Sequence, residues 1–260
     1  MKVISLGWGV QSWTLAAMAA LGEIEADIAI HADTGWEKAA TYAFREQWEP
    51  WLQAHGLLAI SVADYQQSAK VTTLATDIPA FTVSATGNAG ILRRQCTGRW
   101  KIDPIRRALK QVLWMCDIKK RAGCIESLQG ISLDEWQRMK NSDVKWIVNR
   151  YPLVEKRMTR GDCETWLAAH DLPTPPKSAC VFCPFQSERA WGELKRHNAD
   201  DWQTAISVDE KIRDVRAPYR AFVHSKMISL VNAVSIPEDI GMIQADFLDN
   251  AGCDSGYCFV

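Results

Sequence analysis

The chain has 260 residues, of which 47% are hydrophobic and 23% charged, and its formal net charge is −1. This length suits one α/β domain with a small appendage, and the near-neutral charge argues against a protein that coats DNA. No apolar run reaches about 18 residues, so we predict no membrane span and no membrane partner, and the N-terminus shows no secretory signal. We expect a cytoplasmic protein whose eight cysteines are mostly reduced.

The N-terminal part of the chain alternates between strand-like and helix-like segments. Apolar runs at 2–6, 26–32 and 57–62 predict buried strands, while 12–21 and 37–55 combine helical spacing with strong helix formers. This β-α-β-α-β order predicts a parallel sheet with crossover helices, which is the α/β fold class.

Two short loops follow the first and second of these predicted strands. The loop at 7–12 has the sequence Gly-Trp-Gly-Val-Gln-Ser, and glycines before a helix let backbone N–H groups approach an anion. The loop at 33–35, Asp-Thr-Gly, suits a ribose or a metal-bound phosphate. In both places the alternative is a turn that only connects strand to helix. Since ligands lie beyond the carboxyl ends of such strands, we expect the two loops to share one pocket.

The middle of the chain is less regular. We expect a long functional loop over 64–95, and then a helix over 103–115 with proline at its first helical position. A fourth strand at 125–131 and extended segments at 146–148 and 151–154 follow.

The C-terminal part is predicted to be helical before it becomes irregular. Thr159-Arg-Gly-Asp162 is typical of a capping box at the start of a helix, and further helices are expected at 187–196 and 199–215. The pattern then weakens, so we divide the chain into a domain over 1–215 and a C-terminal tail over 216–260.

A basic segment spans 93–121, with ten Lys or Arg residues and two Asp. Such a run is often a solvated helix face. Here Arg99 and Lys101 precede the predicted helix, in a loop that also carries Cys96. Because guanidinium and ammonium groups suit phosphate or sulfate oxygens, we favour an oxyanion-binding loop.

Cysteine spacing gives the strongest single motif of the chain. Cys180 and Cys183 stand one turn apart after a proline-rich approach. A buried thiol pair, a redox dithiol, half of a zinc site and half of an iron–sulfur site are the open alternatives. A metal needs further ligands, for which Cys96 and Cys163 are the candidates, although a lone helical cysteine such as Cys163 is most often a packing residue.

Two more cysteines, Cys253 and Cys258, lie at the end of the chain around Asp-Ser-Gly-Tyr. A terminus that contains glycine suits a thiol that visits a site and then meets a reductant. A terminus with incidental cysteines is the alternative.

Taken in order, five of these segments resemble the phosphoadenosine phosphosulfate (PAPS) reductase family, within the adenine nucleotide alpha hydrolase-like superfamily. The resemblance covers most of residues 1–185. It is carried by the loop at 5–12, His-Ala-Asp-Thr-Gly at 31–35, Cys-Thr-Gly-Arg-Trp-Lys at 96–101, the segment 130–159 and the Cys180–Cys183 pair.

The resemblance implies a Rossmann-like parallel sheet with flanking helices, and a helical and irregular C-terminal appendage. It also implies an enzyme of sulfur metabolism that binds an adenine nucleotide (PAPS, APS or ATP). The expected nucleotide contacts lie in the loops after the first two strands and are Gly7, Gly9, Gln11, Ser12, Asp33 and Gly35.

For catalysis, the resemblance implies that Arg99 and Lys101 hold the sulfate or a phosphate. Cys253 is the expected attacking thiol, and a reductant such as thioredoxin is the expected partner. Cluster-binding members of the family hold a 4Fe–4S centre with four thiolates, and zinc is the alternative metal. The expected ligands are Cys96, Cys163, Cys180 and Cys183.

Three departures from the family pattern define the alternatives. Gly7, Trp8 and Gln11 stand where ATP pyrophosphatases of the superfamily have Ser, Gly and Asp, which argues against Mg-ATP cleavage. Gln95 precedes Cys96 where cluster-binding reductases have a second cysteine, so either Cys163 is the fourth ligand or the fourth iron is open to sulfide or substrate. The tail lacks the family's Glu-Cys-Gly-x-His. The alternatives to sulfonucleotide reduction are ATP-dependent iron–sulfur thiolation of a nucleic acid, and a non-catalytic nucleotide- or zinc-binding protein.

Overall fold

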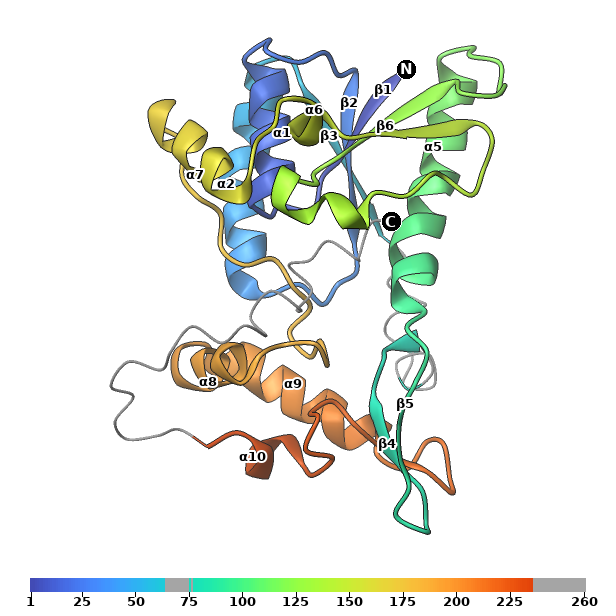
Figure 1. Cartoon of the computed structure of the whole chain (residues 1–260), viewed down its shortest axis with the longest axis vertical. Coiled ribbons are helices and arrows are strands. Elements are labelled where there is room, and N and C mark those ends of the chain that lie inside the picture. Colours follow the sequence, from blue (N-terminus) through green and yellow to red (C-terminus); the bar gives the residue numbers. More distant parts are fainter. Residues whose placement is uncertain (64–74, 76, 236–260) are drawn as a thin grey trace.

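A computed structural model describes residues 1–63, 75 and 77–235 of the chain. Its centre is a five-stranded sheet of order β3-β2-β1-β6-β7, in which every neighbouring pair is parallel. The strands are β1 (Lys2–Ser5), β2 (Ile28–Asp33), β3 (Leu58–Ala63), β6 (Ile125–Gln129) and β7 (Ile147–Arg150). The sheet occupies the upper part of Figure 1 and confirms the predicted α/β fold with a parallel sheet.

The burial of the strands follows from their sequences and their places in the sheet. Every residue of β2 is buried, as expected for a central strand that is covered on both faces. By contrast, β3 lies at the edge of the sheet and its side chains are partly exposed. The strand order reverses between β1 and β6, which is the place where open α/β sheets bind ligands.

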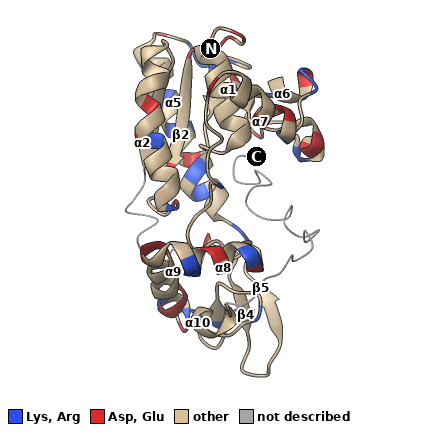
Figure 2. Ribbon diagram, turned by 90° about the vertical axis from the view of Figure 1, so that its left-hand side faces the viewer, with Lys and Arg blue, Asp and Glu red and all other residues tan. Residues whose placement is uncertain are grey.

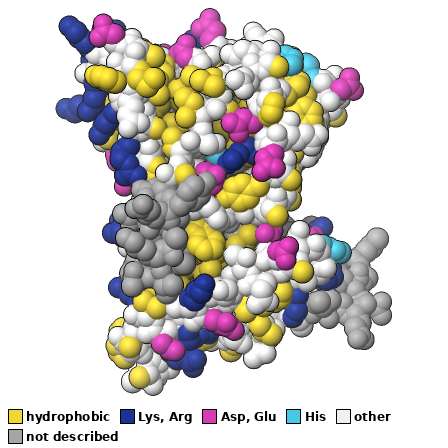
Figure 3. Space-filling view, turned by 180° about the vertical axis from the view of Figure 1, so that it is seen from behind, with side chains coloured by type: hydrophobic (Ala, Val, Ile, Leu, Met, Phe, Trp, Pro, Cys, Tyr) yellow, Lys and Arg dark blue, Asp and Glu magenta, His cyan; other side chains and the backbone are white. Residues whose placement is uncertain are grey.

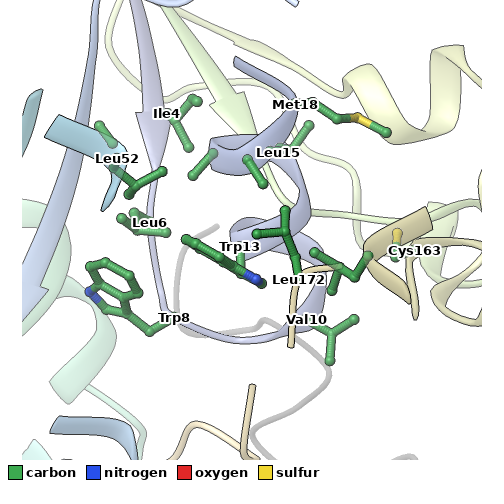
Figure 4. Close-up of a cluster of buried hydrophobic side chains, with 14 of the residues drawn as sticks. Ile4, Leu6, Trp8, Val10, Trp13, Leu15, Met18, Leu52, Cys163 and Leu172 are labelled. Atoms are coloured by element: carbon green, nitrogen blue, oxygen red, sulfur yellow. The ribbon is translucent and has the colours of Figure 1, made fainter. Parts of the chain in front are cut away.

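One face of the sheet is covered by α1 (Val10–Ala20), α2 (Ala39–Ala54) and α7 (Arg160–Ala169) (Figure 1). These helices enclose a core rich in aromatic rings, in which the rings of Trp8 and Trp13 stack 6.1 Å apart. Figure 4 shows the two indoles lying beside Leu6 and Leu15 within this cluster.

The other face of the sheet is covered by α5 (Asp103–Met115). Its buried side chains Leu109 and Leu113 pack against Val3 and Ile30, which alternate along β1 and β2 with the residues of the opposite face. Proline stands in the first turn of α5, as predicted, because its fixed φ suits a helix start.

A second lobe lies below the sheet in Figure 1 and has a core of its own. It contains an antiparallel sheet of order β5-β4-β8, whose buried members include Ala221 and Phe222 of β8, next to α9. Its elements are β4 (Phe81–Val83), β5 (Ala89–Ile91), α8 (Glu188–His197), α9 (Ala199–Ile212), β8 (Arg220–Phe222) and α10 (Leu230–Ala233). We call the part built on the parallel sheet the sheet lobe; Figure 2 shows the two lobes one above the other.

Three predictions for the middle of the chain are wrong. The segment 64–95 is not a single loop, because β4 and β5 form a hairpin within it; residues 64–74 and 76 lie outside the described residues. The cationic segment before α5 is not a loop but a π-helix, η1 (Thr97–Ile102). Residues 151–154 are not extended, because α6 (Pro152–Glu155) begins there with proline in its first turn.

The predicted capping box is confirmed at the start of α7. The Thr159 hydroxyl accepts a hydrogen bond from the backbone N–H of Asp162 at 3.2 Å, and the Asp162 carboxylate accepts one from the backbone N–H of Thr159 at 2.8 Å. A 3₁₀ helix, η2 (Leu133–Arg138), precedes β7. Among the described helices, none combines the length and the apolar character that a membrane span requires.

The C-terminal part divides between the second lobe and residues that the structure does not describe. Residues 220–234 contribute β8 and α10 to the core of the second lobe. Cys253 and Cys258 lie outside the described residues. The division into 1–215 and 216–260 therefore stays a prediction.

Candidate functional site

A pocket lined by cysteines lies where the two lobes meet. We define the thiol pocket by Cys96, Cys180, Cys183 and Lys101, which all line it. Cys96 directly precedes η1, whereas the other two cysteines belong to the loop between α7 and α8, so segments far apart in the sequence meet here. The rest of the lining is mostly apolar and consists of Ile78, Pro79, Arg94, Thr97, Trp100, Phe182, Pro184 and Phe185.

The cysteine loop is held by the loops that follow β1 and β2. The backbone N–H of Val181 donates to the carbonyl of Trp36 at 2.8 Å, and the backbone N–H of Lys38 donates to the carbonyl of Ala179 at 3.2 Å. The Ser178 hydroxyl donates to the carbonyl of Gly7 at 2.7 Å. These bonds bring the thiols to the carboxyl ends of the two central strands, where ligands of α/β sheets bind.

A buried carboxylate, Glu37, lies between the cation and one thiol of the pocket. Its Oε1 is 3.4 Å from the ammonium of Lys101 and accepts a hydrogen bond from the Thr34 hydroxyl at 3.5 Å. The same hydroxyl lies 3.8 Å from the sulfur of Cys180. The other oxygen, Oε2, is buried without a hydrogen-bond partner among the described residues. Leaving a buried acceptor unpaired costs about 1–3 kcal/mol, so Glu37 keeps an unsatisfied hydrogen-bond acceptor beside its contact with Lys101.

Arg99, the second cation predicted for catalysis, contacts a carboxylate of the second lobe. Its guanidinium donates to Oδ1 of Asp77 at 2.7 Å, and the indole of Trp100 donates to Oδ2 at 2.9 Å. Asp77 is fully buried, whereas the Arg99 side chain is 56% exposed. The pair fixes η1 against the second lobe, and Arg99 does not line the thiol pocket as Lys101 does.

The loop between β1 and α1 satisfies part of its own hydrogen bonding. The backbone N–H of Gly7 donates to the Ser12 hydroxyl at 3.1 Å, and this hydroxyl donates to the carbonyl of Gly9 at 3.2 Å. Trp8 adopts a positive φ of 56°, which costs a non-glycine residue roughly 1–2 kcal/mol. Its indole is buried beside Trp13, so the loop is anchored in the core of the sheet lobe (Figure 4).

Gln11 belongs to a polar cluster at the reversal of strand order. Its amide N–H donates to the Ser132 hydroxyl at 3.4 Å and to a carboxylate oxygen of Glu135 at 3.1 Å. Burial raises the pKa of Glu135, and its ion pair with Arg138 opposes this shift. Gly130 has no space for a side chain, because a Cβ there would lie 2.7 Å from the backbone nitrogen of Ser12. Ser132, Glu135 and Arg138 carry no motif in the sequence that indicates this cluster.

Asp33 and Gly35 form a turn that holds the next helix. The Asp33 carboxylate accepts hydrogen bonds from the backbone N–H of Gly35 and the hydroxyl of Tyr42, both at 2.9 Å. Its second oxygen pairs with Arg45 at 2.8 Å. Burial and the Asp33 charge raise the pKa of Tyr42, so the phenol stays a donor. These contacts are those expected if residues 33–35 form a turn that connects the strand to the helix, and they place Asp33 against α2.

A second pocket lies between α5 and the sheet. We call it the α5 pocket. Isoleucines at 30, 105 and 147 give it apolar walls, and side-chain amides and hydroxyls come from β1, β6 and β7. Flat apolar walls with a few polar groups suit a planar heterocycle. Its lining is Ser5, Ile30, Ile102, Ile105, Arg106, Leu109, Ser127, Gln129, Asn141, Ser142, Asp143, Ile147 and Asn149. Ile102 follows Lys101 directly, so the two pockets are neighbours along η1.

Cys163 lies apart from the thiol pocket. It is buried in the core under α7, near Val10 and Leu172 (Figure 4). Burial raises the pKa of its thiol to about 12, with a hydrogen bond to Thr14 opposing the shift. A thiol of this kind is a packing residue.

The residues that the structure describes do not complete a metal site. A 4Fe–4S centre takes four cysteine ligands, and only three of the four expected cysteines line the thiol pocket. Within residues 1–63, 75 and 77–235, no group of three or more His, Cys, Asp or Glu side chains is arranged to hold a metal ion. The described cysteines of the pocket therefore do not by themselves fit a cluster with four cysteine ligands.

Comparison with known proteins adds little to the assignment of a family or a function. No family model matches the chain, and no curated protein matches it. A solved structure with partial similarity is the crystal structure of phosphoadenylyl-sulfate (PAPS) reductase from Candida auris in a phosphate complex. The two chains are 11% identical, the similarity covers 67% of this chain and 74% of that one, and the TM-score is 0.42. A similarity this low assigns no residue of the site.

Proposed function

We propose that this protein is an enzyme that binds an adenine nucleotide and performs sulfur chemistry on it at the thiol pocket. The observation that carries the proposal is the meeting of Cys96, Cys180 and Cys183 with the buried Lys101 at the carboxyl ends of β1 and β2. Thiols supply a nucleophile, and a buried ammonium supplies charge for an anionic substrate group. The nucleotide and its sulfur group are parts of the proposal drawn from the sequence resemblance.

The proposed reaction is reduction of a sulfate group carried by the nucleotide. The thiolate of Cys180 attacks the sulfur atom, the S–O bond to the nucleotide phosphate breaks, and the nucleotide leaves with the electron pair of that bond. The thiolate of Cys183 then attacks the sulfur of Cys180, which releases sulfite and leaves a disulfide. A dithiol such as thioredoxin reduces this disulfide. Cys253 is the alternative first nucleophile.

Lys101 and Glu37 have distinct roles in this proposal. The ammonium of Lys101 binds the sulfate or a phosphate oxygen and is held in place by Glu37, 3.4 Å away. Oε1 of Glu37 accepts a hydrogen bond from the Thr34 hydroxyl, which lies 3.8 Å from the sulfur of Cys180. In the proposal, the proton of the Cys180 thiol passes through this hydroxyl to the carboxylate as the thiol ionises.

The α5 pocket is the proposed site of the base. The side-chain amides of Gln129 and Asn149 in this pocket can donate hydrogen bonds to the edge of a purine and accept them from it. The isoleucine walls can contact the faces of the ring. A nucleotide with its base there has its anionic end toward η1 and Lys101.

Calorimetry with PAPS, APS and ATP tests nucleotide binding. We expect Lys101→Ala to weaken binding by about 1.5–3 kcal/mol, as for a charge-assisted hydrogen bond. Lys211→Ala, at an exposed lysine of α9, is the matched control and should bind like the unmodified protein. Equal affinity in Lys101→Ala would remove this residue from the anion site.

Product analysis separates the proposed reaction from its alternatives. Release of sulfite from PAPS or APS, lost in Cys180→Ser, supports reduction. Conversion of ATP to AMP instead supports ATP-dependent thiolation, and the absence of both products supports a non-catalytic binding protein.

Iron and sulfide analysis after anaerobic purification tests the predicted cluster. Stoichiometric iron and sulfide that disappear in Cys183→Ser would support it, with a ligand from outside the described residues. Protein free of iron and sulfide would contradict the cluster and leave the thiol reaction in place.

A further inference from the structure

The exposed face of α5 combines positive charge with an aromatic ring. Arg107, Lys110 and Trp114 follow one another at intervals of three and four residues, so they share one face of the helix. All three are exposed, and the Trp114 side chain is 83% exposed. The opposite face carries Leu109 and Leu113, which are buried against the sheet. The apolar face is therefore already occupied, and the indole lies outside the core.

The loop after α5 extends the same surface. Lys119, Lys120 and Arg121 are all exposed in this loop. The ammonium of Lys120 lies 5.4 Å from the centroid of the Trp146 ring. The exposed Lys145 belongs to the neighbouring segment, because its carbonyl accepts a hydrogen bond from the backbone N–H of Gly123 at 3.0 Å.

We call these cations the basic stripe: Arg107, Lys110, Lys119, Lys120, Arg121 and Lys145. Figure 3 shows Lys and Arg side chains gathered along the edge of the molecule where α5 lies. Within the segment from Arg107 to Arg121, Asp117 is the acidic residue. The nearby Asp143 is paired with Arg106. The local charge is strongly positive in a chain whose formal net charge is −1.

The cations of the stripe and the exposed indole together suit a partner that is a polyanion and carries flat rings. Phosphates bind to cations such as those of the stripe, and bases stack on exposed aromatic side chains. A membrane surface fits less well, because an interfacial helix must insert its apolar face, and α5 buries that face on the sheet. An acidic protein surface would form ion pairs with the cations, but it would supply no ring to stack on the indole of Trp114.

We propose that the basic stripe and Trp114 bind a nucleic-acid strand, with phosphates on the cations and one base stacked on the indole. The helix has 13 residues and so spans about 20 Å, and the loop after it extends the cationic surface further. The proposal stands on this surface alone and does not rest on the thiol chemistry.

Fluorescence anisotropy with labelled single-stranded DNA and RNA of about 16 nucleotides tests the proposal. We expect binding that weakens steeply as salt rises from about 50 to about 200 mM. The double variant Lys110→Glu with Lys119→Glu should lose at least about tenfold in affinity and show a shallower salt dependence. Trp114→Ala should lose about tenfold with an unchanged salt dependence, because stacking involves no counterion release.

The matched control reverses two exposed cations of the second lobe, Lys211→Glu with Arg216→Glu. It makes the same change in net charge and should bind like the unmodified chain. Three results would overturn the proposal: no binding of either strand, equal loss in the control, or unchanged affinity in both stripe variants. Sedimentation velocity completes the test, since a dimer that Trp114→Ala dissociates would assign the surface to a second copy of the chain.

Discussion

The two lobes are built in opposite ways from the sequence. The sheet lobe takes most of its strands from consecutive β-α units, and β1, β2 and β3 follow one another both in the chain and in the sheet. The second lobe joins the β4–β5 hairpin to β8, which is more than a hundred residues later in the chain. The thiol pocket draws on both: Glu37 and Thr34 come from the sheet lobe, whereas Trp100 and Phe182 belong to the core of the second.

Because of this difference in construction, the candidate site lies in the part of the molecule that local sequence patterns predict least well. A site at the end of a parallel strand needs only that strand and its loop. The thiol pocket also requires the core of the second lobe, which packs the cysteine loop against η1. Substitutions in each lobe and the pH dependence of unfolding test whether the two lobes behave as one unit.

Phe182 anchors the cysteine loop in the core of the second lobe, against a ring from the loop that follows β2. It is fully buried between Cys180 and Cys183, and its ring meets that of Trp36 edge to face at 5.2 Å. We expect Phe182→Ala to lower the free energy of unfolding by about 3–5 kcal/mol, the usual effect of truncating a buried aromatic residue. Urea denaturation followed by tryptophan fluorescence measures this change.

Phe185→Ala is the matched control in the same loop. This ring is only partly buried, so its truncation should cost no more than about 1 kcal/mol. If Phe182→Ala produced two separate unfolding transitions, the lobes would be independent units joined through this side chain. A cost equal to that of the control would show that Phe182 does not hold the lobes together.

Gly130 tests the close approach within the sheet lobe. An added Cβ would lie 2.7 Å from the backbone nitrogen of Ser12, so the loop after β6 and the start of α1 must separate. We expect Gly130→Ala to destabilise the protein by about 1–3 kcal/mol, as for overpacking.

Gly98→Ala provides the comparison for this substitution. A Cβ at Gly98 meets nothing within 4 Å, so the change should be close to neutral in thermal or urea unfolding. If both alanines were tolerated equally, the predicted close contact between Gly130 and Ser12 would be absent in solution.

Two buried histidines, one in each lobe, predict the dependence of stability on pH. Burial lowers the pKa of His31 in the sheet lobe and of His224 in the second lobe. Below about pH 6.5 the two histidines therefore bind protons in the unfolded chain that they do not bind in the folded chain. As a result, the free energy of unfolding falls as the pH decreases. Each group contributes at most about 1.4 kcal/mol per pH unit.

Urea unfolding at about pH 7.5 and about pH 5.5 measures this slope. We expect His31→Gln and His224→Gln each to flatten it, whereas the exposed His55→Gln should not. An unchanged slope in either variant would show that folding does not lower the pKa of that histidine.

The sheet lobe was largely predictable because its patterns are local. Continuous apolar runs identified β1 and β2, and the Asp-Pro start identified α5. In the second lobe, the helices α8 and α9 were predicted close to their observed bounds, but the sheet was not, because β4, β5 and β8 have three residues each and show no period. The strand β8 joins this sheet only through its long-range pairing with β4, which no local pattern reveals.

The candidate site was predictable in part. Cys96, Cys180, Cys183 and Lys101 were identified from thiol spacing and basic residues, and the structure brings them to one pocket. Glu37 was missed, although its place two residues after the Asp-Thr-Gly turn was an available signal. Asp77 and the polar lining of the α5 pocket gave no signal, because a single acidic, serine or asparagine residue in the sequence does not reveal what it will face.

The hydrogen bond from Ser178 to Gly7 joins residues 171 positions apart. During synthesis on the ribosome, β1, β2 and β3 can therefore pair long before the segment that contains Cys180 has emerged. The thiols reach their partners only after most of the chain is made, whereas the strand ends that receive them are already ordered. Assembly of the pocket is thus a late step, and a nascent chain that stops before Ser178 has the sheet edge but no cysteine loop to place on it.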